Sequence, residues 1–406
     1  MASIKGNWTL AVIILISAAA AVLSTSVGLR QSLGLFMEPM VRGAGISVSA
    51  FGLAMAIQNL AWGIGQPFMG GLADRYGGRV VILVAALFYA IGLVLMGVGG
   101  IAGLMVGGGI LIGLATAGTS YGVLVGEVSR GVSPEIRQTV VSIVAAAGSI
   151  GTFILAPVTQ EMIEGIGWET ALFIFAGLAL AISTMAMPLK VNGGKPGTTA
   201  RAEANAGKAI RAAMSHPGYL AMTVAFFACG FQLIFVATHL PNYISLCGLP
   251  PSVGAQSLAL IGICNAVGTL VIGKLGQRYG NKLMLAIVYM GRTTAIVAYV
   301  MLPVSVESTL IFAAAMGFFW LSVVPLVSGL ISGMFGLANF GVLFGVMFLS
   351  HQVGSFLGAW LGGLTFEMSG SYFIAWMSLI AVGALAAIVQ LSMDDRPRPG
   401  LQPAAG

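Results

Sequence analysis

The stretch "LADRYGGR" at residues 72–79 has a second version further along the chain, "LGQRYGNK" at residues 275–282. The two copies lie 203 positions apart (from 72 to 275), which is half of the 406-residue chain. The matching positions are Leu72 and Leu275, Arg75 and Arg278, Tyr76 and Tyr279, Gly77 and Gly280, and Arg79 and Lys282. Each copy follows one long apolar segment and precedes another, so the chain is expected to consist of two related halves.

The composition indicates an integral membrane protein. Hydrophobic residues make up 58% of the chain and charged residues only 7%, whereas soluble domains carry about 25% charged residues. Only helices and closed barrels span a lipid bilayer. Barrel strands are about ten residues long with alternating polarity, and the apolar runs here are longer and continuous. Helices are therefore predicted, and the 58 glycines suit their close packing.

Glycines, prolines and charge clusters divide the apolar sequence into twelve segments. We predict twelve transmembrane helices near residues 9–37, 48–72, 79–99, 101–128, 138–163, 168–189, 218–243, 253–275, 282–303, 306–333, 338–366 and 371–392. The expected domains are an N-terminal six-helix bundle (1–189), a cytoplasmic linker (190–217), a C-terminal six-helix bundle (218–392) and a cytoplasmic tail (393–406). A short surface helix is expected over 199–214 in the linker.

The basic residues set the expected orientation. With the N-terminus inside, 15 of the 18 lysines and arginines fall at cytoplasmic ends and loops, while glutamates gather outside. The first apolar run is interpreted as an uncleaved helix, because it is long and further spans follow. The sequence thus predicts a multi-pass protein of the cell inner (plasma) membrane with both termini cytoplasmic. The net charge of +6 is explained by this topology and indicates no nucleic-acid partner.

The sequence contains no pattern typical of an enzyme. The three cysteines have neither metal-site nor disulfide spacing, and "GGKPG" in the linker lacks the context of a phosphate-binding loop. We therefore expect no catalytic residues, no cofactor and no bound metal. A duplicated six-helix unit is instead typical of alternating-access transporters, whose substrate site lies between the halves near the bilayer midplane.

The segment "GGLADRYGGR" (70–79) resembles the loop signature between helices 2 and 3 of the major facilitator superfamily. The resemblance covers the whole chain and implies an all-α membrane protein with twelve transmembrane helices in two pseudo-symmetric bundles. It also implies that Asp74, Arg75, Arg79 and Arg278 gate the cytoplasmic face, where Asp74 would latch one conformation.

Arg30 is the first candidate for substrate binding. A guanidinium stays charged at physiological pH, and an arginine at a helix centre costs roughly 2.5–3.5 kcal/mol on insertion scales. Arg30 lies about seven residues, or roughly 10 Å, from the predicted outer end of the first helix. It either extends to the outer headgroups or anchors substrate in a central cavity. The second interpretation is preferred because helices 1, 4, 7 and 10 line the cavity in the superfamily.

Two further residues bring charge or titratable groups into the spans. Arg292 lies near the middle of the ninth segment, where a structural bond to carbonyls of a neighbouring helix and contact with substrate are equally expected. His351 lies next to Gln352 in the middle of the eleventh segment. Histidine changes charge near neutral pH, so His351 could carry a coupling proton or meet an anion. The alternative is a neutral histidine bonded across helices.

The charges inside the spans favour an anionic substrate. Asp and Glu are absent from the middle of the predicted spans, whereas Arg30 and Arg292 supply positive charge there. A cavity with positive centres attracts anions, and an arginine fork fits a carboxylate in bidentate fashion. The expected substrate is a small organic anion, a mono- or dicarboxylate.

Within the superfamily, the chain resembles the branch of the oxalate:formate antiporter and the monocarboxylate transporters. The run "SHQVGS" (350–355) places His351 where the antiporter has a helix 11 lysine. The helix 1 lysine of the monocarboxylate transporters would align near Gln31. "NAVGT" (265–269) keeps Asn265 but has Thr269 in place of the helix 8 arginine, so the anion-binding pair is expected at Arg30 with His351 or Arg292. Tyr121 and Asn265 are further candidate supports.

The sequence therefore predicts a monomeric secondary transporter that works by rocker-switch alternating access, with proton symport or exchange against a counter-anion. Two alternatives stay open. One is a drug or metabolite exporter of the same fold, and the other is a membrane sensor that binds without transporting.

Overall fold

A computed structural model describes residues 9–189, 199–335 and 340–396. It is all-helical over these residues, and twelve of its helical segments are long and apolar enough to cross a membrane. Nine spans are single helices: α3 (Val48–Tyr76), α4 (Gly78–Val98), α8 (Pro134–Ile166), α9 (Trp168–Met185), α11 (Pro217–Leu246), α12 (Pro251–Tyr279), α13 (Asn281–Met301), α16 (Phe340–Ser369) and α17 (Phe373–Ser392). The predicted fold class and number of spans are confirmed.

The other three spans are interrupted. The first span consists of α1 (Leu10–Ser32), a 3₁₀ turn η1 (Leu33–Phe36) and α2 (Met37–Ala44). The fourth span consists of α5 (Gly100–Gly103), a π-helical segment η2 (Leu104–Leu111), α6 (Ile112–Gly118) and α7 (Tyr121–Gly131). The tenth span consists of α14 (Val306–Phe318) and α15 (Val323–Phe335). The predicted first segment was too short, because the helical path continues to Ala44. Arg30 thus lies fourteen residues, about 21 Å of helix, from that end.

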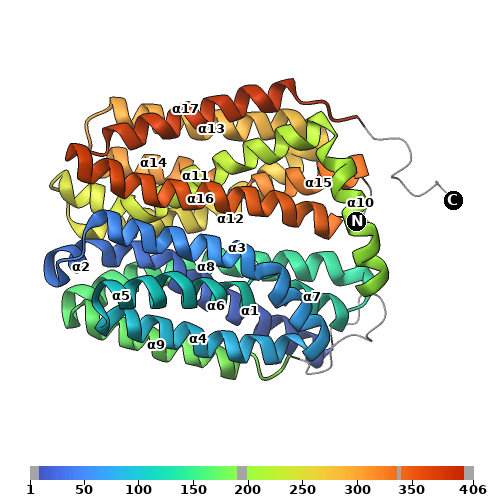
Figure 1. Ribbon diagram of the computed structural model, residues 1–406, viewed down its shortest axis with the longest axis horizontal. Helices are drawn as coiled ribbons and strands as arrows, with labels where there is room; N and C mark the ends of the chain where they lie inside the picture. Colours follow the sequence, from blue (N-terminus) through green and yellow to red (C-terminus); the bar gives the residue numbers. More distant parts are fainter. Residues whose placement is uncertain (1–8, 190–198, 336–339, 397–406) are drawn as a thin grey trace.

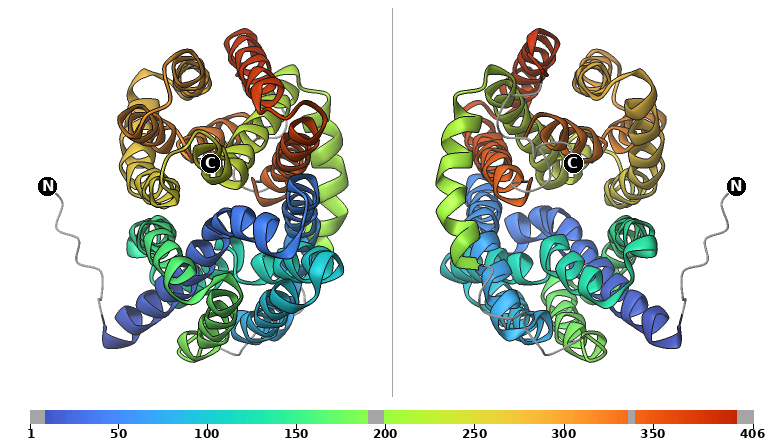
Figure 2. Two further views of the ribbon diagram at one scale, coloured as in Figure 1. Left: turned by 90° about the vertical axis from the view of Figure 1, so that its left-hand side faces the viewer. Right: turned by 90° about the vertical axis from the view of Figure 1, so that its right-hand side faces the viewer.

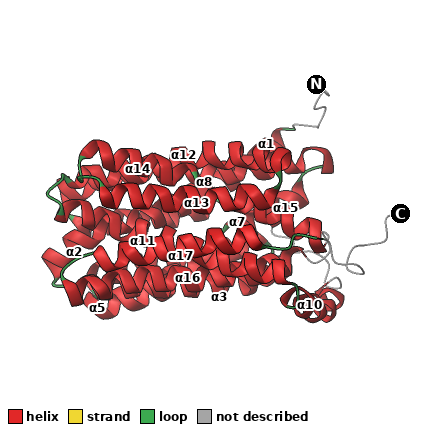
Figure 3. Ribbon diagram, turned by 90° about the horizontal axis from the view of Figure 1, so that it is seen from above, coloured by secondary structure: helices red, strands yellow, loops and turns green. Residues whose placement is uncertain are grey.

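The spans gather in two bundles, the first six in blue to green and the last six in yellow-green to red (Figures 1 and 2). A separate helix, α10 (Thr199–Met214), crosses one end of the molecule beside the bundles (Figure 3). This helix agrees with the surface helix expected over 199–214. We call the end with α10 the basic end, and the end with α2 the acidic end.

The duplication seen in the sequence is also present in the backbone. Left-handed glycines, which tolerate positive φ because they lack a Cβ, recur 203 positions apart at three pairs of turns: Gly45 (φ 63°) and Gly248 (φ 80°), Gly77 (φ 88°) and Gly280 (φ 94°), and Gly167 (φ 84°) and Gly370 (φ 66°). In both copies of the loop, the guanidinium of the arginine lies over the ring of the tyrosine that follows it: Arg75 over Tyr76 and Arg278 over Tyr279. Positions related by 203 are therefore structural equivalents.

The two bundles meet along two helix pairs, α3 with α16 and α8 with α12. Hydrogen bonds and a ring contact join the bundles from the middle of these helices to the acidic end. At the acidic end itself, Ser245 donates to Glu38 (2.7 Å), and the Ser49 amide donates to Glu367 (3.0 Å). The two bundles are therefore in contact from the middle of the molecule to the acidic end.

Candidate functional site

Arg30 turns toward the interior of the first bundle. Its Nη2 donates to Asn59 Oδ1 on α3 (2.5 Å), and its guanidinium carbon lies 4.6 Å from the centre of the Trp62 ring. Asn59 and Trp62 are three residues apart and so share a face of α3. Within the described chain, Arg30 forms no ion pair with a carboxylate, and its buried Nε has no hydrogen-bond acceptor. A guanidinium with five donors therefore keeps capacity for an external anion.

A chain of amides links Arg30 to the second bundle. Asn59 Nδ2 donates to the Met55 carbonyl (2.8 Å), which turns Asn59 Oδ1 toward Arg30. The Asn59 backbone carbonyl accepts from Gln352 Nε2 (2.8 Å) on α16, so Gln352 Oε1 faces His351 Nδ1 (3.0 Å). Because an amide oxygen only accepts hydrogen bonds, His351 Nδ1 carries the hydrogen. In the neutral ring, Nε2 is then the nitrogen that accepts a proton.

Ring contacts make a second link between Arg30 and His351. The Trp62 ring, which lies under Arg30, meets Phe348 edge to face (centroids 5.2 Å apart) across the junction of the bundles. Phe348 is in turn nearly parallel to the ring of His351 (5.9 Å, 6°). Arg30 and His351, which belong to different bundles, are therefore linked through Trp62 and Phe348, and these four residues form the candidate site.

Trp62 is positioned by hydrogen bonds to residues nearer the basic end. Its Nε1 donates to Gln66 Oε1 (2.7 Å), and Gln66 Nε2 donates to Ser120 Oγ (2.9 Å). Ser120 lies at the interruption between α6 and α7, directly before Tyr121, whose side chain is 42% exposed. Tyr121 thus lies beside the groups that position Trp62. Gln31 is half-buried on α1 next to Arg30.

Arg292 has a different environment. It is fully buried, and its Nε and Nη2 donate to the carbonyls of Phe319 (3.0 Å) and Trp320 (2.9 Å). These carbonyls lie where α14 ends and the tenth span is interrupted, and so lack the partners that a continuous helix would give them. Of the two roles expected for Arg292, this geometry supports bonding to a neighbouring helix. The buried Cys229 thiol interacts with both Arg292 and His351.

Asn265 supports the same interruption from another side. Its Oδ1 accepts from the Leu321 amide (2.9 Å), and its Nδ2 donates to Ser149 Oγ (3.0 Å) on α8 of the first bundle. With both ends of its amide occupied by protein groups, Asn265 connects the bundle junction to the interrupted tenth span.

The four residues expected to gate lie at the basic end. Asp74, Arg75 and Arg278 are exposed, and Arg79 is half-buried with its guanidinium at the Met187 sulfur (2.6 Å). Behind them, the buried Glu127 accepts from the Gly78 amide (2.7 Å) at the first turn of α4. A carboxylate at a helix N-terminus is favourable, so Glu127 fixes this loop. Gating by the four residues stays a prediction.

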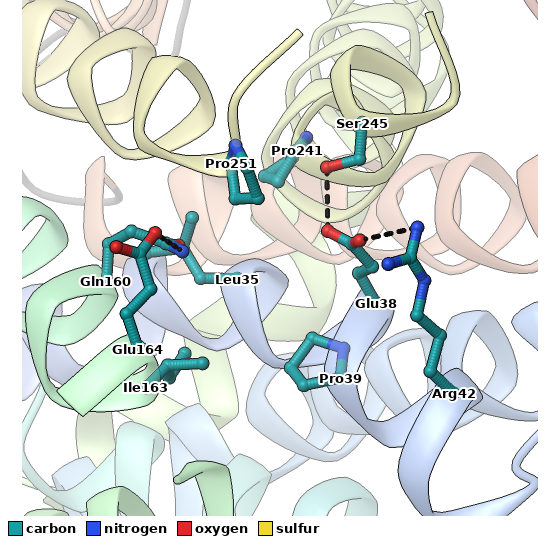
Figure 4. A pocket seen from close by; sticks show the side chains of 10 residues that line it. All are labelled: Leu35, Glu38, Pro39, Arg42, Gln160, Ile163, Glu164, Pro241, Ser245 and Pro251. Atoms are coloured by element: carbon teal, nitrogen blue, oxygen red, sulfur yellow. Dashed lines mark hydrogen bonds and ion pairs between the residues drawn. The ribbon is translucent and has the colours of Figure 1, made fainter. Parts of the chain in front are cut away.

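A small pocket of about 230 Å³ lies between the bundles at the acidic end (Figure 4). On one side of it, Glu38 pairs with Arg42 (3.0 Å) and accepts from Ser245 of α11 (2.7 Å). On the other side, Gln160 donates to Glu164 (2.8 Å). The polar groups shown are thus satisfied by one another, and the pocket marks the closed end of the junction.

Sequence reasoning identified Arg30, His351 and Gln352 as candidates but left out Trp62, Phe348 and Cys229. Asn59 is one of several polar residues that the sequence offers as cavity groups, and nothing in the sequence singles it out. The spacing of Asn59 and Trp62 on one face of α3 could have paired them, but nothing in the sequence brings Phe348 opposite Trp62. Potential metal-binding clusters of His, Cys, Asp and Glu are absent from the described residues.

Comparisons with known proteins agree with this architecture. The family model described as Major Facilitator Superfamily matches residues 8–320. An uncharacterized MFS-type transporter of Bacillus subtilis, YcxA, is 23% identical over 390 residues, which cover 89% of this chain and 90% of that protein. Mouse monocarboxylate transporter 11 is 26% identical over 389 residues, covering 91% and 85%.

Solved structures show the same fold. A bacterial homologue of the human lysosomal transporter Spinster, in an inward-facing and unoccupied conformation, has a TM-score of 0.76 at 13% identity, covering 97% of this chain and all of that one. A variant of the nucleoside transporter NupG has a TM-score of 0.75 at 16% identity, covering 94% and 99%.

Proposed function

The chain belongs to the Major Facilitator Superfamily, and from this premise we propose that it is a secondary active transporter of a small organic anion that carries a carboxylate. The observation that supports this substrate class most strongly is the environment of Arg30. Its permanent charge points into the protein and has no carboxylate partner among the described residues. A bound carboxylate would supply the missing charge and would accept from the unused donors in bidentate fashion.

The site favours one carboxylate over two. The second buried arginine, Arg292, uses two of its nitrogens on backbone carbonyls and has only Nη1 without a partner, so Arg30 is the better placed cation for substrate at this junction. The rings of Trp62 and Phe348 offer an apolar surface to the rest of the molecule. A monocarboxylate with an apolar body suits these groups, and the names of the monocarboxylate transporter relatives agree with this choice.

Transport would follow from relative motion of the two bundles. With the basic end in the cytoplasm, as the positive-inside rule predicts, the contacts from the midplane to the acidic end close the outer side. Substrate would then reach Arg30 from the cytoplasmic side in this state. Opening of the outer side requires loss of the Ser245–Glu38 and Gln352–Asn59 hydrogen bonds. The second of these bonds belongs to the site itself, so substrate binding and bundle motion are coupled there.

The proposal is tested by thermal unfolding of the purified protein in the presence of mono- and dicarboxylates. We expect monocarboxylates to give the largest rise in the midpoint of unfolding. Amides of the same shape, which lack the charge, should give no rise. Flux is then measured in proteoliposomes with the acid that stabilises most. Stabilisation only by cations or neutral hydrophobic compounds would reject the carboxylate and support an exporter. Binding without flux would support a sensor.

Substitution of His351 by glutamine is expected to abolish proton-driven accumulation and to leave substrate exchange intact. We propose that His351 Nε2 takes up the proton that travels with the acid, and a glutamine side chain carries no such proton. The measurement compares uptake driven by an imposed proton gradient with exchange at equal pH, both in proteoliposomes. The control is His216→Gln, at the start of α11 and away from the site. Proton-driven accumulation that persists in the His351 variant would contradict this role.

A further inference from the structure

A long apolar groove lies between α13 and α14, on the outside of the second bundle and away from the candidate site. Its volume is about 830 Å³. The walls consist of small and apolar side chains, with Gly291, Thr294, Ala295 and Ala298 on α13 and Ile311, Phe312, Ala315 and Phe319 on α14. From Ile287 to Leu302 the groove follows fifteen residues of helix, about 22 Å.

At the equivalent place in the first bundle the two helices touch. Gly92 of α4 and Gly107 of η2 lie against each other's backbone, with Leu95 and Ile112 beside them. The residues 203 positions later are Ala295, Leu310, Ala298 and Ala315. In the second bundle both glycines are replaced by residues that carry side chains, and two alanines replace the bulky Leu95 and Ile112. The groove therefore results from divergence between the duplicated halves.

The groove faces the bilayer. Ile287, Met290, Leu302 and Ile311 line it and are all exposed. An empty apolar gap loses dispersion contacts, and water would gain few hydrogen bonds there. An acyl chain of a lipid fills such a gap best.

Polar groups occur at one end of the groove. Ser305, Glu307 and Ser308 lie at the start of α14, at the acidic end, and Glu307 is the one charged residue among those that line the groove. One Glu307 oxygen accepts from Ser305 (2.8 Å), so the carboxylate can still accept from a second donor. A negative group at the headgroup level favours a lipid whose head bears a hydrogen-bonding cation over an anionic lipid.

We propose that the groove between α13 and α14 binds one phospholipid with a primary-amine headgroup. One acyl chain lies along the groove, and the ammonium donates to Glu307. The inner end of this chain contacts Phe319, whose carbonyl accepts from Arg292. The bound lipid thus touches the interruption of the tenth span.

Native mass spectrometry of the detergent-purified protein, titrated with phosphatidylethanolamine or phosphatidylcholine of identical chains, tests this site. The quaternary ammonium of phosphatidylcholine cannot donate a hydrogen bond, so we expect it to bind about fivefold more weakly. Glu307→Gln should remove this preference, and the control Glu169→Gln, a first-turn glutamate of α9, should keep it. Equal binding of the two lipids by the wild type would overturn the headgroup assignment.

The acyl-chain site is tested by filling the groove. Ala298→Trp should lower the binding of both lipids about fivefold or more, whereas the control Leu385→Trp, at an exposed position of α17, should leave it unchanged. Thr294→Phe, at another exposed groove position, repeats the test should the first variant fold poorly. Wild-type binding in both filled variants would overturn the proposal. The lipids are measured without substrate, so this result is independent of the proposed transport function.

Discussion

Arg30→Gln is expected to weaken binding of the transported acid about a hundredfold and to reduce its uptake in proteoliposomes to background. Two charge-assisted hydrogen bonds to a carboxylate contribute about 3 kcal/mol together, and each 1.4 kcal/mol corresponds to a factor of ten in affinity. Glutamine retains a donor that can reach Asn59 but has neither the charge nor the fork. The affinity is measured by calorimetric titration of the purified variant with the most stabilising monocarboxylate.

Arg30→Lys separates charge from geometry. The ammonium keeps the charge but cannot form the bidentate pair or stack flat on Trp62, so an intermediate loss of about tenfold is expected. Arg211→Gln, which removes an exposed positive charge from α10, is the control for net charge. A folded Arg30→Gln variant that binds acids as the wild type does would exclude Arg30 as the anchor.

Much of the fold could be predicted because it depends on local features of the sequence. The length of each apolar segment predicts a span, and the repeated "RYG" motif places a glycine at equivalent turns where φ is positive, Gly77 and Gly280. The bilayer then requires these spans to be helical, since a backbone in lipid must satisfy its own hydrogen bonds. The interruptions of the fourth and tenth spans were not predicted. Their hydropathy is continuous, and in the tenth span the backbone groups freed by the interruption are satisfied by side chains from other spans, Arg292 and Asn265.

The site was predictable only in part for a related reason. A buried charge such as Arg30 is costly in lipid and therefore conspicuous in a sequence. Its partners are not, because Asn59 resembles other polar residues in the spans, and Trp62 and Phe348 resemble ordinary packing residues. Which of them meet depends on how α3 and α16 face each other across the bundles. That orientation is a tertiary property that periodicity along one helix does not encode.

The equivalence of the two halves gives Arg292 a counterpart, and the comparison explains what each does. The residue 203 positions earlier is Tyr89, whose hydroxyl donates to the Ser26 carbonyl of α1 (3.2 Å). Both side chains thus run from the third helix of a bundle to a backbone carbonyl of a neighbouring span. Tyr89 reaches the first span of its bundle, whereas Arg292 reaches the fourth span of its own, where the interruption offers two carbonyls that a guanidinium satisfies better than a single hydroxyl.

Arg292→Met is consequently expected to lower the free energy of unfolding by about 3 kcal/mol, because two buried carbonyls lose charged donors. Tyr89→Phe, the equivalent change in the first bundle, removes one neutral hydrogen bond and should cost about 1 kcal/mol. Thermal unfolding of both purified variants measures the difference as the fall in midpoint. Since Arg292 lies outside the proposed site, the fraction of Arg292→Met that remains folded should bind the acid with nearly wild-type affinity. Unchanged stability together with lost binding would instead make Arg292 a substrate ligand, and the anchor would then have to be shared between the two bundles.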